Sequence, residues 1–454
     1  MTESRTIPPE RLWSPDTRPF IASVLALMTF IAFESFAVTT VLPVAMSDLD
    51  GAQWYSFAYA ATITAALVGM VIGGNWADRS GPRTPLIVGG ALFLAGLAMC
   101  VVAPDPATFI LGRLFQGLGG GIDSVVLYVL IAQHIPENLR PRMFGLLTTA
   151  WLVPSLAGPV VAGVLTDFMS WRAVFGIVLA GSALSILRLL SLTAPNDHPR
   201  RLTSQPVVGR KGALSIVAAA LLITLHAGGQ VNQPASAVIV VGALIALIVV
   251  ARGILPTGTL VLRGAPQRLV ALRAILGATV TSTDLYLTLY LQAERGFPPT
   301  TAGLVIAVGA LGWGLGAWVQ GRFSSERSAH RRLILAAGPL VTFGPASVLS
   351  YIVVGLPLWV VVVGCVVMGT GMGMAYPRLS SATLALAKAH ERGEYSSALQ
   401  TGESMSVAAT TAMTAVVLTS ALSTSVSFAL VYAILVGLAC LAISIASLRT
   451  TAHS

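Results

Sequence analysis

Ionisable side chains inside apolar segments are the residues of this chain with the clearest capacity for chemistry. Glu34, Arg113, Asp123 and Asp284 each lie within a run of apolar residues long enough to cross a bilayer. A charge at such a depth costs about 2.5–3.5 kcal/mol on insertion scales, so it needs a partner or a function. Carboxyl groups there can exchange protons near neutral pH. We expect these four residues to handle protons, although each could instead belong to a structural ion pair.

Glu34 and Arg113 are placed at comparable depths by their distances from the ends of their apolar runs. Counting from outer ends near Val44 and Ala107, at about 1.5 Å per residue, puts Glu34 about 15 Å deep and Arg113 about 9 Å deep. Both side chains are long enough to bridge the difference. The spacing therefore predicts an ion pair inside the membrane, with Asp123 deeper and nearer the cytoplasm.

The composition requires that most of the chain faces lipid or a packed membrane interior. The 454 residues are 55% hydrophobic and only 10% charged, whereas soluble domains carry roughly 25% charged residues. The net charge is +9, but most Lys and Arg residues fall in the tails and in alternate loops. Lys and Arg are enriched in the cytoplasmic loops of membrane proteins. The basic excess therefore indicates which loops are cytoplasmic, and we expect no nucleic-acid partner. The three cysteines form no metal-binding or disulfide pattern.

Fourteen apolar runs have about the length of a membrane-spanning helix. An even number of spans, together with the basic loops, predicts that both termini are cytoplasmic. We expect an all-α integral membrane protein. The runs cover approximately residues 19–44, 52–76, 84–104, 107–133, 144–166, 171–193, 212–231, 235–252, 268–293, 301–321, 332–354, 357–380, 396–420 and 426–448.

The runs divide into six helices, an inserted pair and six more helices. The second basic linker carries Arg252, Arg263, Arg268 and Arg273. No aqueous segment is long enough to form an independent enzyme, and we expect no enzymatic activity. The predicted organisation is an N-terminal tail at 1–18, a six-helix bundle at 19–193, two basic linkers around the inserted pair at 194–267, a second six-helix bundle at 268–448, and a tail at 449–454.

The segment GNWADRSGPRTPL, between the second and third runs, combines small and charged residues at a specific spacing. It closely resembles the loop that follows the second spanning helix in the major facilitator superfamily. That resemblance implies two six-helix bundles related by an axis along the membrane normal. It also implies a cytoplasmic gate. The residues that carry the match are Gly74, Asp78, Arg79, Gly81 and Arg83.

Further motifs in the first half resemble the fourteen-helix drug:proton antiporters of that superfamily. The fourth run reads GRLFQGLGGG from Gly112, similar to the family's R-x-x-Q-G motif, which is associated with proton transfer. Gly158, Pro159 and Gly163 resemble the G-P-x-x-G-G antiporter motif of the fifth helix, with Ala162 in place of one glycine. Proline removes a backbone donor and bends a helix, and small neighbours permit close packing. Glu34 stands where the family commonly has Asp, but residues 35–41 diverge from its motif.

The two-bundle plan makes the first helices of the halves pseudo-symmetric mates. Asp284 lies about as far into its run as Glu34 does into its own, so both could face one central cavity. Glu403 could join Asp78 in the cytoplasmic gate or be structural. Aromatic side chains could line a lipophilic cavity or simply pack between helices. The candidates are Phe33, Tyr128, Trp151, Tyr286 and Tyr290.

The resemblance implies a proton-coupled exporter of amphiphilic or lipophilic small molecules that works by alternating access. We expect a monomer in a bacterial cytoplasmic membrane, in contact with lipid, with a lipophilic or cationic substrate, no metal and no cofactor beyond the coupling protons. A rival interpretation is an exporter of an endogenous lipid or metabolite. Another is a sensor or scaffold that transports nothing.

Overall fold

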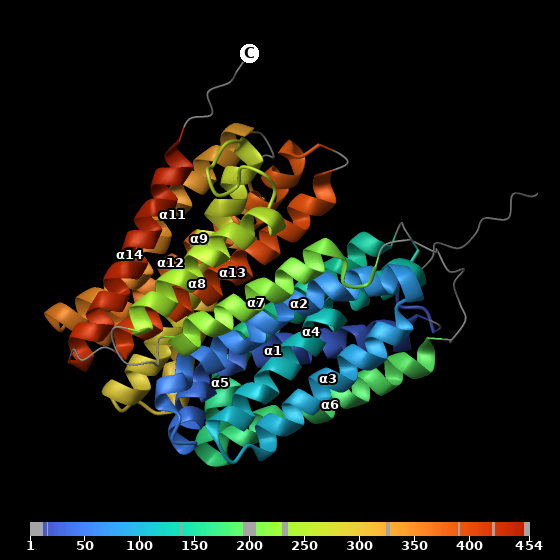
Figure 1. Cartoon of the computed structure of the whole chain (residues 1–454), viewed down its shortest axis with the longest axis horizontal. Coiled ribbons are helices and arrows are strands. Elements are labelled where there is room, and N and C mark those ends of the chain that lie inside the picture. The colour runs from blue at the N-terminus through green and yellow to red at the C-terminus, as the bar shows by residue number, and fades with distance from the viewer. Residues whose placement is uncertain are drawn as a thin grey trace, which may run out of the picture.

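The computed structural model describes residues 12–15, 17–136, 139–193, 206–228, 235–323, 327–388, 391–419 and 423–448. Within these residues every regular element is a helix, and there are fourteen α-helices (Figure 1). The predicted all-helical class is therefore confirmed. Most of the predicted N-terminal tail, all of the predicted C-terminal tail and residues 194–205 of the first linker lie outside the described part.

The first half contains six long helices separated by short turns. Proline or a capping side chain marks several of their starts, as expected where backbone N–H groups lack partners. The turn after α2 needs a left-handed residue, and Gly81 supplies it with φ +79°. The helices are α1 (Arg18–Asp48), α2 (Tyr55–Ser80), α3 (Arg83–Val102), α4 (Pro106–His134), α5 (Arg140–Phe168) and α6 (Trp171–Leu192), with a short 3₁₀ turn η1 (Ala52–Trp54) before α2.

The second half repeats the plan after the inserted pair. Its first helix continues into a π-helical turn, η2 (Tyr290–Glu294), a conformation often found at functional positions. The inserted helices are α7 (Gly209–Gly228) and α8 (Ala235–Ile254). The other six are α9 (Ala265–Leu289), α10 (Pro299–Gly321), α11 (Arg327–Val354), α12 (Leu358–Leu386), α13 (Arg392–Leu418) and α14 (Thr424–Ser447).

Eleven of the helices in the described residues are long and apolar enough to cross a membrane by length and composition alone. In α8 the apolar stretch is the shorter Val238–Ile254. Helices α9 and α13 are not among the eleven, because both carry charged residues on faces that other helices of the protein cover. A helix enclosed by other helices does not need a uniformly apolar surface. These two helices can therefore lie within the bundle although their composition is less apolar.

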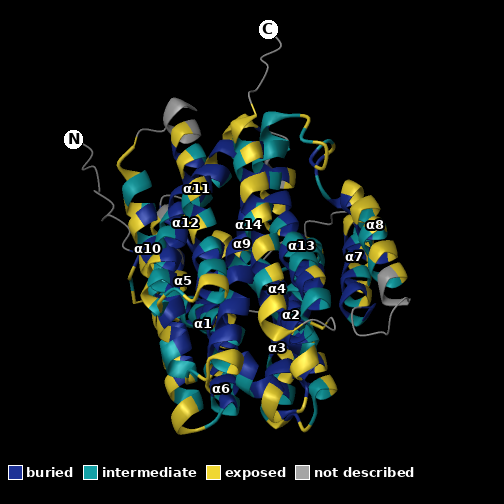
Figure 2. Ribbon diagram, turned by 90° about the vertical axis from the view of Figure 1, so that its left-hand side faces the viewer, coloured by how far each residue is buried: buried dark blue, intermediate teal, exposed yellow. Residues whose placement is uncertain are grey.

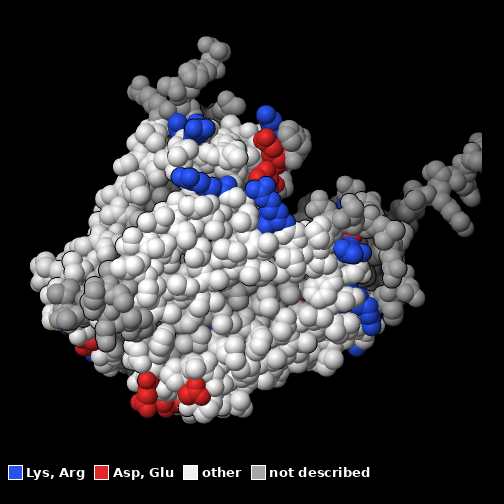
Figure 3. All heavy atoms as spheres, in the orientation of Figure 1, with Lys and Arg blue, Asp and Glu red and all other residues white. Residues whose placement is uncertain are grey.

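The helix ends form two faces of opposite charge. One face, here called the basic end, carries Arg79, Arg83, Arg140, Lys211 and Arg263 among others. The other, the acidic end, carries Asp48, Asp50, Asp105, Asp167 and Glu294, with Arg172 and Arg295 beside them. In Figure 3 most of the blue residues lie on the upper and right-hand sides, and red residues mark the lower edge.

Asp105 caps the start of α4 at the acidic end. Its carboxylate accepts hydrogen bonds from the Thr108 backbone N–H at 2.9 Å and from the Thr108 hydroxyl at 2.8 Å. These bonds favour the ionised form, so they hold the pKa of Asp105 below its usual range. The cap therefore stabilises the helix at neutral pH, and this contribution is lost as the pH falls through the lowered pKa.

The two halves share one hydrophobic core toward the acidic end and separate toward the basic end. The largest buried cluster contains α1–α6 residues together with Leu285, Tyr286 and Tyr290 of the second half. A separate cluster around Leu276, Val341 and others holds the second half together nearer the basic end. Figure 1 shows the lobes meeting at one end and diverging toward the other, and Figure 2 shows buried residues inside the bundle. We call the boundary between the halves the seam.

The inserted pair lies across one side of the seam. In Figure 1 α7 runs between α2 and α13, and one buried cluster joins α2, α7, α8 and α13 through residues such as Leu67, Leu222, Leu247 and Met405. His226 of α7 stacks on Phe57 of α2 at 5.3 Å between ring centroids. Lys211 of α7 pairs with Glu394 of α13 at 3.5 Å. The pair therefore contacts both halves through apolar and polar groups.

Glycines bring α4 close to its neighbours α2 and α3. A Cβ atom added to Gly117 would overlap the backbone of Thr62, and one added to Gly121 would overlap the backbone of Ala66, both on α2. On another face, Gly119 lies against the backbone of Phe93 on α3. Small residues that permit such approach are typical of helix packing in membranes.

Replacing Gly117 by alanine should destabilise the protein, because the methyl group would push α2 away from α4. We expect Gly117→Ala to lower the free energy of unfolding by about 1–3 kcal/mol, the usual cost of overpacking. Gly314→Ala on α10 is the matched control, since nothing lies within 4 Å of a Cβ there. Thermal unfolding of the purified protein in detergent measures both, and equal midpoints would contradict the packing argument.

The charge asymmetry predicts that the basic end faces the cytoplasm. Cys100, Cys365 and Cys440 are first replaced by alanine, and a single cysteine is then introduced as Ser80→Cys at the basic end or Glu294→Cys at the acidic end. A membrane-impermeant thiol reagent added to whole cells should label only the Glu294→Cys variant. Labelling of only Ser80→Cys would reverse the assignment.

Candidate functional site

Glu34 of α1 and Arg113 of α4 form a buried ion pair, as their depths predicted. The Arg113 side chain is 2% exposed and Glu34 is 4% exposed as a residue. One guanidinium nitrogen donates to the Glu34 carboxylate and also to Gln116 Oε1 at 2.9 Å. The Arg113 Nε donates to the Ala58 carbonyl of α2 at 3.3 Å. The two buried charges therefore compensate each other. Gln116 and the Ala58 carbonyl accept further hydrogen bonds from the guanidinium.

The positions of α1, α2 and α4 allow these contacts. Gly117 follows Arg113 by one helical turn and lets the α2 backbone approach α4. That approach brings the Ala58 carbonyl within reach of the guanidinium. Gly117 of the fourth-helix motif thus makes possible the hydrogen bond that Arg113 of the same motif donates to α2.

Asp123, also on α4, is fully buried but lies apart from the pair. Neither carboxylate oxygen has a hydrogen-bond partner among the described residues. The side chain points toward Gly89 of α3, because a Cβ added to Gly89 would overlap its Oδ1 atom. Asp123 is therefore enclosed within the first half. Its role in proton coupling remains a prediction, and the geometry gives it no ion-pair partner in the described residues.

Asp284 of α9 lies at the seam and is only partly buried. No hydrogen bond or ion pair of its side chain occurs within the described residues. The next residue, Leu285, accepts a hydrogen bond at its carbonyl from the Tyr55 hydroxyl of α2. Ala58, one turn further along α2, accepts from Arg113 of the buried pair. Asp284 and the ion pair therefore both lie near the first turns of α2.

A second charged cluster lies within the second half, where Arg273 of α9 pairs with Glu403 of α13 at 3.2 Å. The Tyr376 hydroxyl donates to Glu403 at 2.9 Å, and Arg273 donates to Ser380 Oγ at 2.8 Å. The prediction that Arg268 and Arg273 lie in a basic linker is wrong, since both residues are inside α9. Arg273 is 5% exposed. Gly277, one turn later, leaves the space that Glu403 fills.

The loop motif after α2 is distributed over several contacts at the basic end. Asp78 and Arg79 are exposed. Arg83 donates to the carbonyls of Leu190, at 2.9 Å, and Thr193, so it caps the end of α6. Gly74 is in ordinary contact with Val125.

The predicted gate residues Asp78 and Glu403 are not brought together in this structure. No contact between them occurs in the part of the chain that is described, and Glu403 is held by Arg273 instead. Because the lobes diverge at the basic end, this separation corresponds to an open arrangement of that end. The gate function itself remains a prediction.

The Gly158, Pro159 and Gly163 motif of α5 packs against α10 across the seam. A Cβ added to Gly163 would overlap the backbone of Thr300, and one added to Gly303 would overlap the Pro159 carbonyl. Gly158 makes only ordinary contacts with aromatic side chains of α1. The motif therefore allows close contact of the halves near the acidic end.

Other bonds close the seam near the acidic end. The Tyr55 hydroxyl donates to the Leu285 carbonyl at 2.8 Å, and Gln292 Nε2 donates to the Thr40 carbonyl at 2.8 Å. Sequence reasoning missed these residues, because polar groups near a helix end carry no signal that identifies a partner in another helix.

The five aromatic candidates do not form one surface. Tyr286 is fully buried, its hydroxyl within 3.0 Å of Ser56 Oγ and donating to the Thr411 carbonyl at 2.9 Å. Tyr290 is buried against other rings nearer the acidic end. Trp151 and Tyr128 are partly exposed on the first half. Trp151 contacts Phe36 edge to face and Tyr128 stacks on Phe144, while half-buried Phe33 lies near Gly158. Only these last three have surface available to a substrate.

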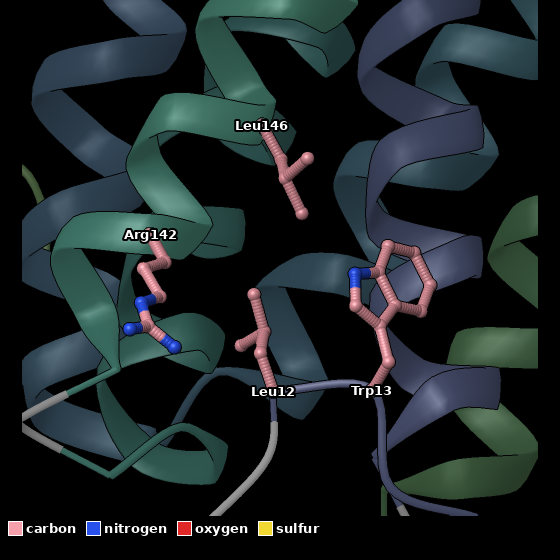
Figure 4. A pocket seen from close by; sticks show the side chains of 4 residues that line it. All are labelled: Leu12, Trp13, Arg142 and Leu146. Carbon is pink, nitrogen blue, oxygen red and sulfur yellow. The ribbon is translucent and has the colours of Figure 1, made fainter.

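Two cavities open at opposite ends of the molecule. One of about 530 Å³ at the basic end is lined by Leu12 and Trp13 from the segment before α1 and by Arg142 and Leu146 from α5 (Figure 4). The other, of about 420 Å³, lies at the acidic end of the seam and includes Asp48, Tyr55 and Gln292. Neither is lined by the carboxylates inside the membrane.

A double-mutant cycle should show how strongly Glu34 and Arg113 depend on each other. Glu34→Gln or Arg113→Met alone leaves one buried charge without its partner, which costs about 3–5 kcal/mol in proteins. We expect the double variant to be more stable than the sum of the single effects by about 0.5–3 kcal/mol. Unfolding in detergent measures the four proteins, and strictly additive effects would contradict the pairing.

Comparison with known proteins places the architecture in a family. The family model described as Major Facilitator Superfamily matches residues 24–411. A probable multidrug-efflux transporter of Mycobacterium tuberculosis is 27% identical over 369 residues, covering 77% of this chain and 76% of the relative. EfpA, an uncharacterized MFS-type transporter of the same organism, is 30% identical over 396 residues, covering 82% and 72%.

Solved structures agree with this fold. The POT family transporter PepTSo superposes with a TM-score of 0.69 at 14% identity, covering 95% of this chain and 97% of that one. A D-xylose-proton symporter gives 0.67 at 14% identity, covering 94% and 97%. At such identities the likeness concerns the fold alone. The matched family model and the two-lobed arrangement of fourteen helices agree, and the chain belongs to the major facilitator superfamily of membrane transporters.

Proposed function

We propose that the protein is a proton-coupled exporter of amphiphilic or lipophilic small molecules that works by alternating access. The observation that carries this proposal is the arrangement of charges inside the membrane. A buried Glu34–Arg113 pair in the first half and Asp284 of the second half, which has no ion-pair partner among the described residues, both lie near the first turns of α2, at the seam where the halves must move. A carboxylate in such a place needs a function to offset its cost. The name of the Mycobacterium tuberculosis relative, a probable multidrug-efflux transporter, supports the direction and class of transport.

The shape supports the alternating-access part of the proposal. The halves are tied together near the acidic end by Tyr55, Gln292 and the α5–α10 contact. Toward the basic end they have separate cores. We interpret this as the conformation open to the cytoplasm, where an exported compound is collected.

The chemistry follows from which carboxyl group binds a proton. A proton arriving from outside neutralises Asp284 or Glu34 and favours release of the substrate outward. Neutral Glu34 no longer balances Arg113, which then needs other acceptors. Loss of the proton to the cytoplasm restores the ionised acids and the affinity for a lipophilic cation. The partly exposed Trp151 and Tyr128 offer apolar surface to such a compound.

Transport into everted membrane vesicles tests the proposal with two probes, ethidium and a fluorescent phospholipid. We expect a proton gradient to drive ethidium accumulation. In Glu34→Gln and Asp284→Asn the driven accumulation should fall by about tenfold or more, because an amide cannot bind and release the proton. Glu294→Gln, an exposed acid at the acidic end, is the matched control and should behave as wild type.

Other outcomes would select a rival. Movement of the phospholipid without ethidium would favour export of an endogenous lipid. Failure of both probes to respond to the gradient would favour a sensor or scaffold. Unaltered gradient dependence in both the Glu34→Gln and Asp284→Asn variants would overturn the coupling assignment.

A further inference from the structure

The start of α10 has no capping side chain of its own. Its N-cap residue is Pro298 and the helix begins at Pro299, so neither position offers a polar side chain or a backbone N–H group. The first N–H group of the helix therefore belongs to Thr300, and it needs an acceptor from elsewhere. It donates to Asp167 Oδ2 at 3.2 Å, and the Thr300 hydroxyl donates to the same oxygen. Asp167 belongs to α5, so the first half of the protein caps a helix of the second half.

The packing of α5 against α10 positions this carboxylate. Asp167 follows Gly163 by four residues, and Gly163 follows Pro159 by four, so the three residues share one face of α5. A Cβ atom added to Gly163 would lie 2.6 Å from the Thr300 Cα. One added to Gly303 would overlap the Pro159 carbonyl. Asp167 is the member of this face nearest the acidic end, and its hydrogen bonds can form only while α5 and α10 are in contact there.

Asp167 is unfavourably placed with respect to its own helix. It lies in the last turn of α5, where the partial negative charge of the helix C-terminus disfavours an anion. At the start of α10 the partial charge is positive, so the same carboxylate is favoured there. The acidic residue at this position is therefore explained by the helix of the other half.

Helices α4 and α6 also begin at the acidic end, and each is capped from within the first half. Asp105 accepts from the Thr108 backbone N–H at 2.9 Å and from the Thr108 hydroxyl at 2.8 Å. Ser170 accepts from the Arg172 backbone N–H at 3.2 Å. Asp105 thus makes the same two kinds of hydrogen bond as Asp167, but its bonds do not depend on contact between the halves.

We propose that Asp167 holds the acidic end closed by capping α10 across the seam. The two hydrogen bonds from Thr300 to Asp167 are called the cross-seam cap below. Asp167 is a positioning residue, which acts on the equilibrium between the two openings and not on substrate. The inference rests on the alternating-access part of the proposed function.

The cross-seam cap is a contact that can be broken in each transport cycle. Asp167 is exposed, so water can replace both hydrogen bonds when the acidic end opens. Removal of an N-cap side chain usually changes an equilibrium by about 2- to 30-fold. Because the cap forms only in the closed conformation, its removal should raise the ratio of open to closed molecules by a factor in that range.

The test measures how often the acidic end opens. Cys100, Cys365 and Cys440 are replaced by alanine, and Thr40→Cys is introduced on α1 as the reporter. Thr40 is fully buried next to Gly303, and its hydroxyl has no hydrogen-bond partner among the described residues. It is buried although the lobes diverge at the basic end, so labelling requires the acidic end to open. The purified protein in detergent is treated with a charged thiol reagent, whose rate of reaction follows the open population when opening is fast.

We expect Asp167→Ala to raise the labelling rate of Thr40→Cys by about 2- to 30-fold. Asp167→Asn should raise it less, because the amide oxygen can still accept both hydrogen bonds. Thr300→Val keeps the backbone N–H and should also have a smaller effect than Asp167→Ala. In the Asp167→Ala background, Thr300→Val should add nothing, because the acceptor is already absent.

Asp105→Ala is the matched control, since it removes the same two kinds of hydrogen bond from the start of α4. It should lower the midpoint of thermal unfolding and leave the labelling rate unchanged. Equal increases in labelling for Asp105→Ala and Asp167→Ala would indicate general loosening of the acidic end and overturn the inference. If the reporter protein without further changes is labelled as fast as the exposed Ser80→Cys, the acidic end is open at rest, which would also overturn it.

Proton-driven ethidium transport in everted vesicles, measured on the same proteins, separates this inference from the proposed function. If Asp167→Ala leaves labelling unchanged while the reporter protein transports ethidium, only the cross-seam cap fails. If labelling changes as expected but the gradient drives no transport, the cap stands and the coupling proposal fails. If Thr40→Cys is labelled in none of the variants, the acidic end does not open, and alternating access and the cap fail together.

Discussion

The buried ion pair between Glu34 and Arg113 is the interaction on which the rest of the first half depends. A guanidinium at this depth is tolerated only when its charge is balanced and its donors are used. Glu34, Gln116 and the Ala58 carbonyl together meet much of that requirement. The last contact requires α2 and α4 to be very close, which Gly117 makes possible. The hydrogen bonds of the buried guanidinium therefore require the close packing of α2 against α4.

Helix α2 connects this constraint to the seam and to the inserted pair. Its N-terminal turns contact α9 through Tyr55 and Ser56, and further along it packs against α7. The inserted pair in turn contacts α13 of the second half. Any change in the angle between the halves has to be accommodated along α2. The same helix also accepts a hydrogen bond from Arg113 at the Ala58 carbonyl.

The sequence predicted the helices well because a bilayer allows few alternatives. Backbone groups in lipid must be paired internally, so long apolar runs become helices, and rise per residue converts position into depth. That conversion was sufficient for the Glu34–Arg113 pair. It failed for Arg273, because a charged residue at the edge of an apolar run is usually assigned to a loop. The partner that allows Arg273 to be buried, Glu403, is 130 positions away in the sequence.

Two further features of the site depend on tertiary structure and could not be predicted. The separation of Asp78 from Glu403 depends on the angle between the lobes, which no local pattern encodes. The hydrogen bond from the Tyr55 hydroxyl to the Leu285 carbonyl follows only from the crossing of α2 with α9. For Asp123 the sequence predicted burial inside a helix. It did not predict that the carboxylate has no hydrogen-bond partner among the described residues.

Proton release from the purified protein on addition of ethidium, in weakly buffered detergent solution near neutral pH, tests the central claim most directly. If substrate and proton compete for the same carboxylates, wild type should release protons in proportion to the ethidium bound. The variant that carries both Glu34→Gln and Asp284→Asn should release none. Saturable binding of ethidium without any change in pH would contradict the account, because the buried acids would then not be coupled to the substrate.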